Sequence, residues 1–364
     1  MKDRLEGIGW FAHETLRRLV NDHPEHEFIF IFDRKWDKSF IYGPNVTPVS
    51  TMIPSRHPFL WFWHYEIDIP RILRKYKPDL FFSPDGWMSL STKVPTVDVI
   101  HDINFMQRAE DFPYFYRKFY RYFFPRYAQK ARQIITVSEY SKADIVNTLS
   151  VDPSKIDVAY NGCGKIFQPL SNEVKVEVRK RFTNGDPYFV FVGSQNPRKN
   201  IVGMLDAFEL FKKRTRNKYK LLLVGKPMWG SVDFDQKIES LKCKDDIVFT
   251  NRVSTEVLQL LLGSSEALML VSFLEGFGIP IIEAMNCDVP VICSNVTSLP
   301  EVAGDAALLV DPYNVESIAD AMVKIAKDEK LRRDLIQKGR LQREKFSWDR
   351  TADAVWNSIQ KIVQ

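Results

Sequence analysis

Two glutamates, Glu275 and Glu283, flank a glycine-containing segment in the last third of the chain. Glu275 follows the continuously apolar run 267–271, which is typical of a parallel strand buried on both faces. Pro280 fits the first position of a helix, so we expect 276–279 to form the loop between strand and helix. The glycines let a ligand approach the backbone, and the amides of a helix start favour phosphate or sugar hydroxyls. The segment therefore predicts an anion-binding or sugar-binding loop.

Glu283 falls one turn inside that helix, among apolar neighbours at 281, 282, 284 and 285. Burying an unpaired carboxylate costs roughly several kcal/mol, so Glu283 needs hydrogen-bond donors, and a ligand diol would supply two. A glutamate that turns to the solvated side of the helix fits the spacing equally well. The spacing alone leaves both interpretations open.

The sequence Glu-Gly-Phe-Gly-Ile-Pro at 275–280, followed by Glu-Ala-Met at 283–285, resembles the signature of retaining glycosyltransferases of family 4, also described as glycosyl transferases group 1. Segments 290–294, 299–304 and 307–312 follow in the order and spacing of that family, and the resemblance extends over nearly the whole chain. It implies the two-domain GT-B fold. It also implies that Glu275 contacts the donor sugar and Glu283 the ribose of the nucleotide, with Gly276, Phe277 and Gly278 in the donor-binding loop.

Arg198 and Lys199 stand between a predicted strand, 188–192, and a predicted helix. Cations at a helix start oppose the helix dipole, a penalty of roughly 0.3–1 kcal/mol each that a bound diphosphate would reverse, although solvated surface cations also tolerate it. The resemblance implies a phosphate-binding lysine here, Lys199, and an arginine a few residues earlier, where this chain has Ser194. Arg198 is the candidate replacement. The resemblance further implies that the nucleotide base docks on the backbone near Val253.

His101 directly follows the predicted strand 96–100, and ligands of open parallel sheets bind beyond the carboxyl ends of the strands. A lone histidine is more often structural, and Asp102 can orient it or cap the following turn. The resemblance implies that His101 reaches the donor sugar.

Gly7 and Gly9 precede a helical apolar pattern at 10–20, which predicts a glycine loop that opens a helix. The resemblance implies that this loop faces the donor phosphates and the acceptor. It also implies an apolar strand before the loop, yet residues 1–6 are too few and too charged to be that strand. We hypothesise that the natural polypeptide begins roughly ten residues earlier. An upstream extension should then raise the melting temperature and the transfer rate, because a missing central strand leaves its neighbours with unpaired backbone groups.

A length of 364 residues predicts two domains. Strands alternate with helices along both halves, which indicates an α/β protein with doubly wound parallel sheets. We expect an N-terminal Rossmann-like domain on the acceptor side, 1–168, and a C-terminal nucleotide-sugar-binding domain, 169–345, facing each other across a cleft. The resemblance implies that a last helix, 346–364, crosses back onto the first domain.

The composition describes a globular protein, 45% hydrophobic and 27% charged, whose net charge of +5 is too small to indicate a nucleic-acid partner. Its apolar runs are only strand-length and its first residues do not form a signal peptide, so we expect a cytoplasmic location, either in solution or at the inner face of the membrane. The four cysteines form no Cys-x-x-Cys pair and should be free thiols. No histidine cluster has metal-ligand spacing, and Asp233 and Asp235 fit a helix start, so no metal is expected.

Two aromatic-rich segments, 58–65 and 112–127, stand out in the first half, and the second interleaves aromatics with four basic residues. Such helices can lie in a membrane interface or bind an anionic acceptor. More often they are core helices whose basic side chains snorkel to solvent. We expect most of these aromatics in the core and keep weak peripheral membrane contact as a minor hypothesis.

These features predict an enzyme that moves a sugar from a nucleotide diphosphate sugar to a glycan, lipid-linked or small-molecule acceptor, with retention of configuration and without a cofactor. Lys199, Arg198 and the amides of 276–278 would stabilise charge on the leaving diphosphate. Front-face attack is what the resemblance implies. One alternative is a sugar-nucleotide epimerase of the same fold, which needs added acid-base carboxylates. The other is a non-catalytic nucleotide-sugar binding protein.

Overall fold

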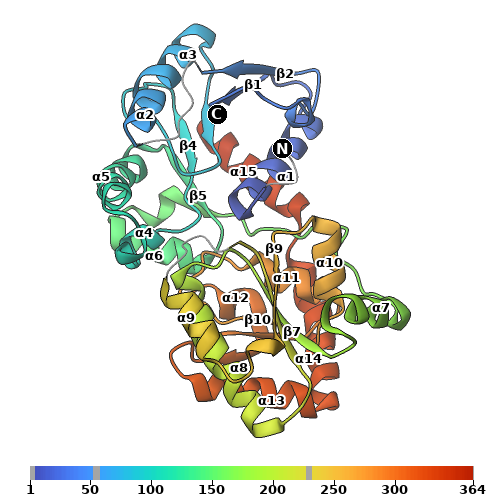
Figure 1. Cartoon of the computed structure of the whole chain (residues 1–364). Coiled ribbons are helices and arrows are strands. Elements are labelled where there is room, and N and C mark those ends of the chain that lie inside the picture. The colour runs from blue at the N-terminus through green and yellow to red at the C-terminus, as the bar shows by residue number, and fades with distance from the viewer. Residues whose placement is uncertain (1–4, 52–57, 227–231, 364) are drawn as a thin grey trace. The chain divides into compact units, whose positions relative to one another are not determined.

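The computed structural model describes residues 5–51, 58–226 and 232–363. The chain divides into two compact units, each of which combines parallel strands with helices (Figure 1). Unit 1 contains residues 1–162 and 347–364, and unit 2 contains residues 163–346. The α/β class with two Rossmann-like units is as predicted.

The strands of unit 1 form two separate parallel sheets, β1-β2 and β3-β4-β5-β6. Among the described residues no strand precedes α1. The elements of unit 1 are α1 (Gly7–Asp22), β1 (Phe28–Phe32), η2 (Lys38–Phe40), β2 (Val46–Ser50), α2 (Pro58–Trp63), the π-helix η3 (His64–Asp68), α3 (Ile69–Tyr76), β3 (Phe81–Ser83), β4 (Thr96–Val99), α4 (Asn104–Gln107), η4 (Ala109–Asp111), α5 (Tyr114–Lys130), β5 (Gln133–Thr136), α6 (Glu139–Leu149), η5 (Pro153–Lys155), β6 (Ile156–Val158) and α15 (Trp348–Val363).

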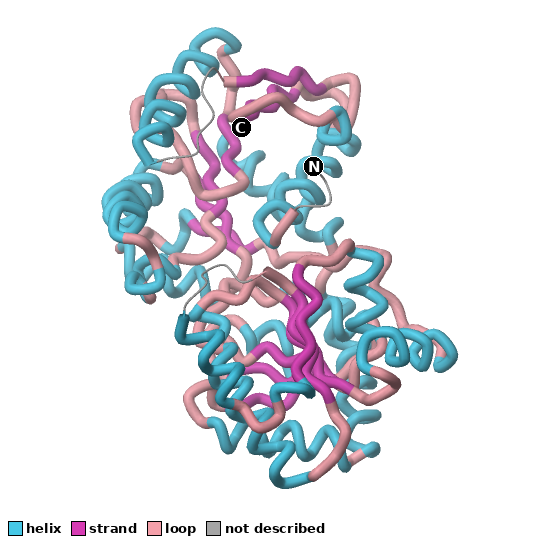
Figure 2. The backbone as a smooth tube through the Cα atoms, in the orientation of Figure 1, coloured by secondary structure: helices cyan, strands magenta, loops and turns pink. Residues whose placement is uncertain are grey.

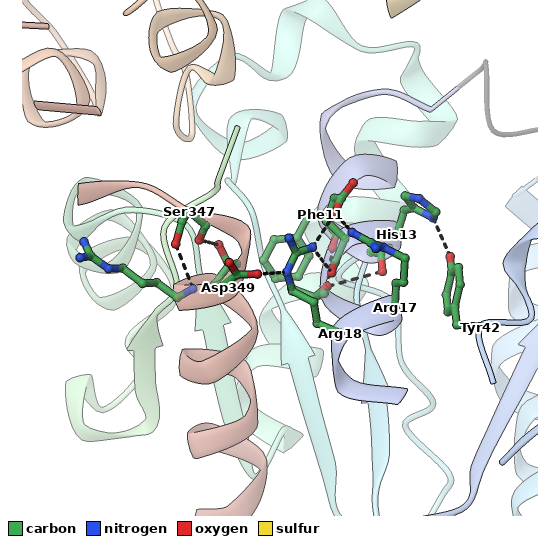
Figure 3. Close-up of polar contacts among 12 residues, drawn as sticks. Phe11, His13, Arg17, Arg18, Tyr42, Ser347 and Asp349 are labelled. Carbon is green, nitrogen blue, oxygen red and sulfur yellow. Dashed lines mark hydrogen bonds and ion pairs between the residues drawn. The ribbon is translucent and has the colours of Figure 1, made fainter. Parts of the chain in front are cut away.

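The last helix, α15, packs against α1 and returns the end of the chain to unit 1, as the resemblance implied. Figure 3 shows Arg18 of α1 reaching Asp349 in the first turn of α15, with Arg18 Nε 2.5 Å from the carboxylate. Farther along α15, the hydroxyl of Ser358 donates to Asp157 of β6 at 2.6 Å. The amphipathic pattern of α15 therefore buries its apolar side on unit 1, and polar contacts fix its position along the helix axis.

Unit 2 has one six-stranded parallel sheet in the order β12-β11-β10-β7-β8-β9, drawn in magenta in Figure 2. Its elements are α7 (Asn172–Thr183), β7 (Tyr188–Val192), η6 (Pro197–Lys199), α8 (Ile201–Thr215), β8 (Lys220–Val224), α9 (Val232–Ser240), η7 (Lys244–Asp246), β9 (Ile247–Asn251), α10 (Thr255–Gly263), β10 (Ala267–Leu270), α11 (Ile279–Asn286), β11 (Val291–Ser294), α12 (Leu299–Ala303), η8 (Gly304–Ala306), β12 (Ala307–Val310), α13 (Val315–Lys327), α14 (Glu329–Gln342) and η9 (Arg343–Lys345).

The apolar runs of β7, β10 and β11 are buried along their whole length, as expected for central strands covered on both faces. Strands β8 and β9 follow on one side of β7, and strands β10, β11 and β12 follow on its other side. This reversal makes the β7/β10 boundary a topological switch point, where loops diverge and leave room for a ligand at the carboxyl edge. The loops that carry Lys199 and Glu275 follow these two strands.

Two local predictions need correction. Helix α1 begins at Gly7, so Gly7 and Gly9 lie in its first turn and do not form a preceding loop. Both residues have ordinary negative φ there, and glycine is compatible with a helix start as well as with a turn. Helix α11 begins at Ile279, so Pro280 occupies its second position. The second position also lacks an intrahelical partner for its N–H, which is why proline is tolerated there.

Candidate active site

The carboxylate of Glu275 lies at the centre of a charged cluster in unit 2. Its Oε2 accepts a hydrogen bond from Arg198 Nη1 at 2.9 Å, and its Oε1 accepts from Ser272 Oγ at 2.7 Å and from Lys199 Nζ. Burial raises the pKa of the Glu275 carboxyl, but the charges of Lys199 and Arg198 outweigh burial and hold the pKa at about 2. Glu275 is therefore an anion at neutral pH and is unsuited to donate a proton.

The backbone around Glu275 is held by two side chains from the loop after β11. Ser298 Oγ donates to the carbonyl oxygens of Glu275 and Phe277, at 2.9 and 3.1 Å. The amide of Glu275 donates to Thr297 Oγ1 at 3.3 Å. Since Ser298 is fully buried, these bonds are shielded from water and fix the position of the carboxylate.

The glycine turn of Gly276, Phe277 and Gly278 joins Glu275 to α11, and all three residues are buried. Gly278 has a φ of +103°, and a Cβ atom at this position would approach Leu299 Cδ2 to 2.7 Å. The ring of Phe277 packs edge-on against Phe346, with 5.6 Å between ring centroids. Only glycine therefore fits the end of the turn without strain, and the turn brings the backbone to the switch point.

Arg198 and Lys199 come from η6, the single turn that follows β7. Lys199 is buried, and its side chain extends past Gly193, where a Cβ atom would lie 3.9 Å from Lys199 Nζ. The sequence predicted two cations available to a diphosphate. In the structure both are also bonded to Glu275, which leaves the three side chains with a net charge of +1. The cluster can still attract an anion, but its geometry is set by the protein's own carboxylate.

Glu283 lies in α11, between Ile282 and Ala284, and is partly exposed. In the part of the chain that the structure describes, no hydrogen bond or ion pair involves its carboxylate, and burial raises its pKa to about 8. The thiols of Cys163 and Cys287 are close enough for the charge of Glu283 to raise their pKa values further. A carboxyl group in this state can accept hydrogen bonds from a ligand without first breaking a bond to the protein.

Ser194 and Val253 both follow strands at the carboxyl edge of the same sheet. Ser194 Oγ accepts a hydrogen bond from Asn196 Nδ2 at 3.2 Å, so this hydroxyl is turned into its own loop. Val253 is half-buried in the short loop between β9 and α10, and Ser254 caps α10 by accepting from the amide of Val257. Unit 2 thus brings Ser194, Arg198, Lys199, Val253 and the Glu275 loop to one edge.

His101 lies in unit 1, two residues after the end of β4. Its Nε2 is 3.0 Å from the carbonyl oxygen of Pro84, and its ring contacts Phe11 edge-on, with centroids 4.9 Å apart. Burial lowers the pKa of His101 despite opposing contributions from the Pro84 carbonyl and Asp102, so the neutral ring is favoured. A carbonyl oxygen only accepts, so Nε2 carries the proton and Nδ1 is an acceptor. Asp102 accepts a hydrogen bond from the amide of Asn104, the first residue of α4, at 3.1 Å, although the N-cap position of that helix is Ile103.

The glycine-containing start of α1 also belongs to unit 1. Gly7 and Gly9 occupy its first turn, where the N–H groups have no intrahelical partner apart from the N-cap carbonyl. Phe11, one turn farther on, is the residue that contacts His101. Figure 3 shows the neighbouring His13, whose Nδ1 lies 2.8 Å from the hydroxyl of Tyr42. The structure therefore links the start of α1 to His101 through Phe11.

Several buried residues that hold the site were not identified from the sequence. Asn200 has a positive φ of 56°, and its Nδ2 donates to the carbonyl oxygens of Val271 and Pro312 at 3.1 and 2.7 Å. Ser272 and Ser298 bond to Glu275 or its loop. Asparagine tolerates the left-handed conformation that Asn200 adopts at the end of η6, whereas the two serines carry no pattern that distinguishes them from other loop serines.

Within the described ranges, no group of three or more His, Cys, Asp or Glu side chains is placed to hold a metal ion, and no helix is long and apolar enough to cross a membrane. Asp233 and Asp235 fall within the first turn of α9, where the sequence predicted a helix start. All four cysteines are free thiols, as expected.

Two family models match the chain, one in each half. The model for Glycosyltransferase Family 4 matches residues 5–163, and the model for Glycosyl transferases group 1 matches residues 175–342. The two matches together account for most of both units.

Relatives and solved structures agree with these models. The O-antigen chain mannosyltransferase B of Escherichia coli is 31% identical over 377 residues, which cover 100% of this chain and 98% of the relative. The O-antigen chain mannosyltransferase RfbU of Salmonella typhimurium is 28% identical over 282 residues, 78% of this chain and 75% of the relative.

Two solved structures illustrate the fold. Anabaena HepE in complex with UDP and glucose has a TM-score of 0.78 at 15% identity, over 98% of this chain and 97% of that chain. WaaG, a glycosyltransferase involved in lipopolysaccharide biosynthesis, has a TM-score of 0.72 at 14% identity, over 95% and 94%. Taken with the motif around Glu275 and the two parallel-sheet units, these matches establish that the chain belongs to glycosyltransferase family 4 and has the GT-B fold.

Proposed function

We propose that this glycosyltransferase moves a mannosyl residue from a nucleotide diphosphate sugar to a glycan or lipid-linked acceptor, with retention of configuration. The observation that carries the proposal is the Glu275 cluster, an ionised carboxylate held by two cations beside a glycine turn at the switch point of unit 2. The mannosyl group is suggested by the relatives named above, which are mannosyltransferases of O-antigen chains.

In this proposal the diphosphate binds next to Lys199, Arg198 and the glycine turn. The net charge of +1 on the Glu275 cluster favours an anion, and it favours the leaving diphosphate most as the bond to the sugar breaks. Because the cations are already oriented by Glu275, they need little reorganisation during the reaction. Glu275 itself remains ionised, so its proposed role is to accept hydrogen bonds from the sugar and to stabilise developing positive charge.

Glu283 is proposed to accept hydrogen bonds from the ribose hydroxyls of the nucleotide, and Val253 to lie against the base. The raised pKa and the lack of a described partner support the first assignment. His101 is proposed as a contact of the donor sugar from unit 1, with Nδ1 accepting from a hydroxyl group. The contact of the donor with Gly7, Gly9 and Ser194 remains a prediction from the sequence. The Ser194 hydroxyl accepts a hydrogen bond from Asn196 and can still donate its own proton to a ligand.

We propose that the reaction takes place in the cytoplasm and needs no metal ion or other cofactor. The cations of the Glu275 cluster occupy the role that a bound metal plays for other diphosphate leaving groups. Activity should therefore survive EDTA. Loss of transfer on chelation, restored by manganese or magnesium, would contradict this part of the proposal.

The test is product analysis with a panel of UDP, GDP and ADP sugars that includes mannosyl donors. We expect one donor to be consumed and a new glycosidic bond to form on a glycan or lipid-linked acceptor. NMR should show that the new bond has the same anomeric configuration as the sugar had in the donor. Glu275→Gln should abolish most of the transfer. Glu177 is an exposed glutamate of α7, so the matched control Glu177→Gln should leave the transfer unchanged.

The two alternatives give different results in the same assay. A sugar-nucleotide epimerase would release an altered sugar nucleotide, or free sugar, without an acceptor. A binding protein would be stabilised by one sugar nucleotide in a thermal shift and turn over none. Inversion at the anomeric carbon would contradict retention while leaving glycosyl transfer intact.

A further inference from the structure

The loop after β12 presents Tyr313, an aromatic side chain with 71% of its surface exposed. The ring stacks on Phe273, in the loop after β10, with 4.8 Å between the ring centroids and 27° between the ring planes. Among the described residues of unit 2, no aromatic side chain is more exposed than Tyr313. Phe273 therefore supports one face of a ring that remains largely open to solvent.

The main chain of the Tyr313 loop is fixed by hydrogen bonds. The amide of Tyr313 donates to Asp311 Oδ1 at 2.9 Å. The carbonyl oxygen of Pro312, which is buried, accepts from Asn200 Nδ2 at 2.7 Å. Asn314 caps α13 with its side chain. Since the ring is already positioned, little conformational entropy is lost when a ligand packs on it.

Hydrogen bonds also join the two rings to the Glu275 cluster. The amide of Phe273 donates to the carbonyl oxygen of Arg198 at 2.8 Å. Phe273 comes two residues before Glu275, so at most about 7 Å separate their Cα atoms. Asn200, which holds the loop after β12, directly follows Lys199. The stacked pair therefore lies next to the candidate active site.

The strand order places the stacked pair away from the proposed base contact. Val253 follows β9, which is one edge strand of the sheet, and Tyr313 follows β12, which is the other. The loops of Glu275 and Lys199 follow β10 and β7, between these two edges. A nucleotide that extends from Lys199 to Val253 therefore leaves the β11–β12 side of the sheet edge to a second substrate.

Two exposed polar side chains accompany the rings. Asn295 follows β11, and within the described ranges its side chain makes no hydrogen bond. Its amide donates to the carbonyl oxygen of Val310, the last residue of β12, at 2.8 Å. Asp311 precedes the ring in the same loop. An aromatic face with amide and carboxylate groups at its rim suits a sugar ring, which offers C–H groups on one face and hydroxyls at its edge.

We propose that Tyr313 and Phe273 form a stacking subsite for one sugar ring of the acceptor glycan, beside the sugar that receives the transferred group. The inference rests on the proposed function, because it places part of the second substrate of that reaction on unit 2. The two rings position the acceptor and take no part in making or breaking bonds. An acceptor of several sugars should therefore bind better than a single sugar.

The test compares transfer to mannose with transfer to α-linked mannotetraose. Tyr313→Ala should raise the KM for mannotetraose roughly two- to tenfold, the effect expected for one lost aromatic contact. The KM for mannose should rise less, because mannose has no second ring, and the kcat and the KM of the donor should stay the same. Tyr313→Phe keeps the ring and should keep most of the affinity.

Leu341→Ala is the matched control, since Leu341 is an apolar residue of unit 2 with 76% of its surface exposed. It should leave all these constants unchanged, and every variant should keep the melting temperature of the unchanged chain. Saturation-transfer NMR with mannotetraose measures binding without turnover. Its signal should be weaker for Tyr313→Ala than for Leu341→Ala.

Three kinetic outcomes for Tyr313→Ala would overturn the proposal. The first is an unchanged KM for mannotetraose, and the second is an equal rise for mannose and mannotetraose. The third is a rise in the KM of the donor alone, which would assign the rings to the sugar nucleotide.

The NMR measurement separates this inference from the proposed function. A chain that transfers no sugar from any donor would contradict the proposed function. A signal that is still weaker in Tyr313→Ala would then support the glycan subsite, whereas a signal that is absent or equal in both variants would overturn it.

Discussion

Glu275 and Lys199 form a buried pair, so each should depend on the other for stability. Lys199→Met leaves the carboxylate with Arg198 and Ser272 only, and breaking a buried ion pair from one side typically costs about 3–5 kcal/mol. The double variant Lys199→Met/Glu275→Gln removes the pair from both sides, so its loss counts the interaction between the two side chains only once. We expect urea unfolding to show that the losses in Lys199→Met and in Glu275→Gln sum to more than the loss in the double variant, although none of the three variants should transfer sugar.

Additive losses in this cycle would contradict the coupling of the two side chains. A Lys199→Met variant that unfolds like the unchanged chain would mean that the pair contributes little to stability. In that case the pairing would matter only for positioning.

Glu283 should release a proton when a nucleotide binds. In the free chain its pKa is about 8, so at pH 7 most molecules hold the proton. Ribose hydroxyls that donate to the carboxylate favour the charged form and lower its pKa. Affinity for the nucleoside diphosphate should therefore rise as the pH is raised from 6 towards the free-state pKa, and then level off.

Calorimetry in buffers of different ionisation enthalpy measures this proton release directly. Glu283→Gln should bind more weakly and release no proton. An affinity of the unchanged chain that does not vary with pH would contradict the assignment of Glu283 to the ribose.

At the scale of elements, the sequence predicts the types and order of strands and helices well, because the buried runs of β7, β10 and β11 are continuous. Residues close to one another in the chain were also well placed, such as Glu275 in a loop before α11. The bond between Glu275 and Lys199 was not predicted, because it joins loops after β7 and β10, whose adjacency follows from the sheet order. The predicted loop at Gly7 was wrong because glycine is compatible with a turn and with a helix start.

The turn between β10 and α11 should tolerate no side chain at Gly278. Gly278→Ala combines an unfavourable positive φ with a contact to Leu299 closer than real Cβ atoms make. Gly185→Ala is the matched control, since its φ is +89° but nothing lies within 4 Å of the added Cβ. We expect urea unfolding to show a loss of about 1 kcal/mol for Gly185→Ala and roughly 2 kcal/mol or more for Gly278→Ala.

The kinetic readout separates the two variants further. Gly278→Ala should also lower kcat/KM, because the turn orients Glu275, whereas Gly185→Ala should not. Equal stability losses, or an unchanged kcat/KM for Gly278→Ala, would contradict this account of the turn.

For the whole molecule, the two units have separate cores and should respond differently to ligands. The proposed nucleotide contacts Glu283 and Val253 lie in unit 2, and a ligand at about 100 times its dissociation constant adds roughly 2.7 kcal/mol to the state that binds it. Seven of the eight tryptophans lie in unit 1, at positions 10, 36, 61, 63, 87, 348 and 356. Tryptophan fluorescence therefore reports mainly the unfolding of unit 1, whereas circular dichroism reports the unfolding of both units.

We expect a nucleoside diphosphate to shift the thermal transition seen by circular dichroism more than the one seen by tryptophan fluorescence. Coincident transitions that shift together would instead indicate that the units unfold as one cooperative body. Glu283→Gln is the control, since it should reduce the shift without changing the fluorescence transition.

The return of α15 to unit 1 also determines the order in which the molecule can be completed during its synthesis. All of unit 2, residues 163–346, is contiguous and is translated before α15. The surface of α1 that receives α15 is therefore covered only after residues 348–363 have been translated. A nascent chain therefore exposes the surface of α1 that α15 later covers, and transiently exposed surfaces of this kind are ones that chaperones bind.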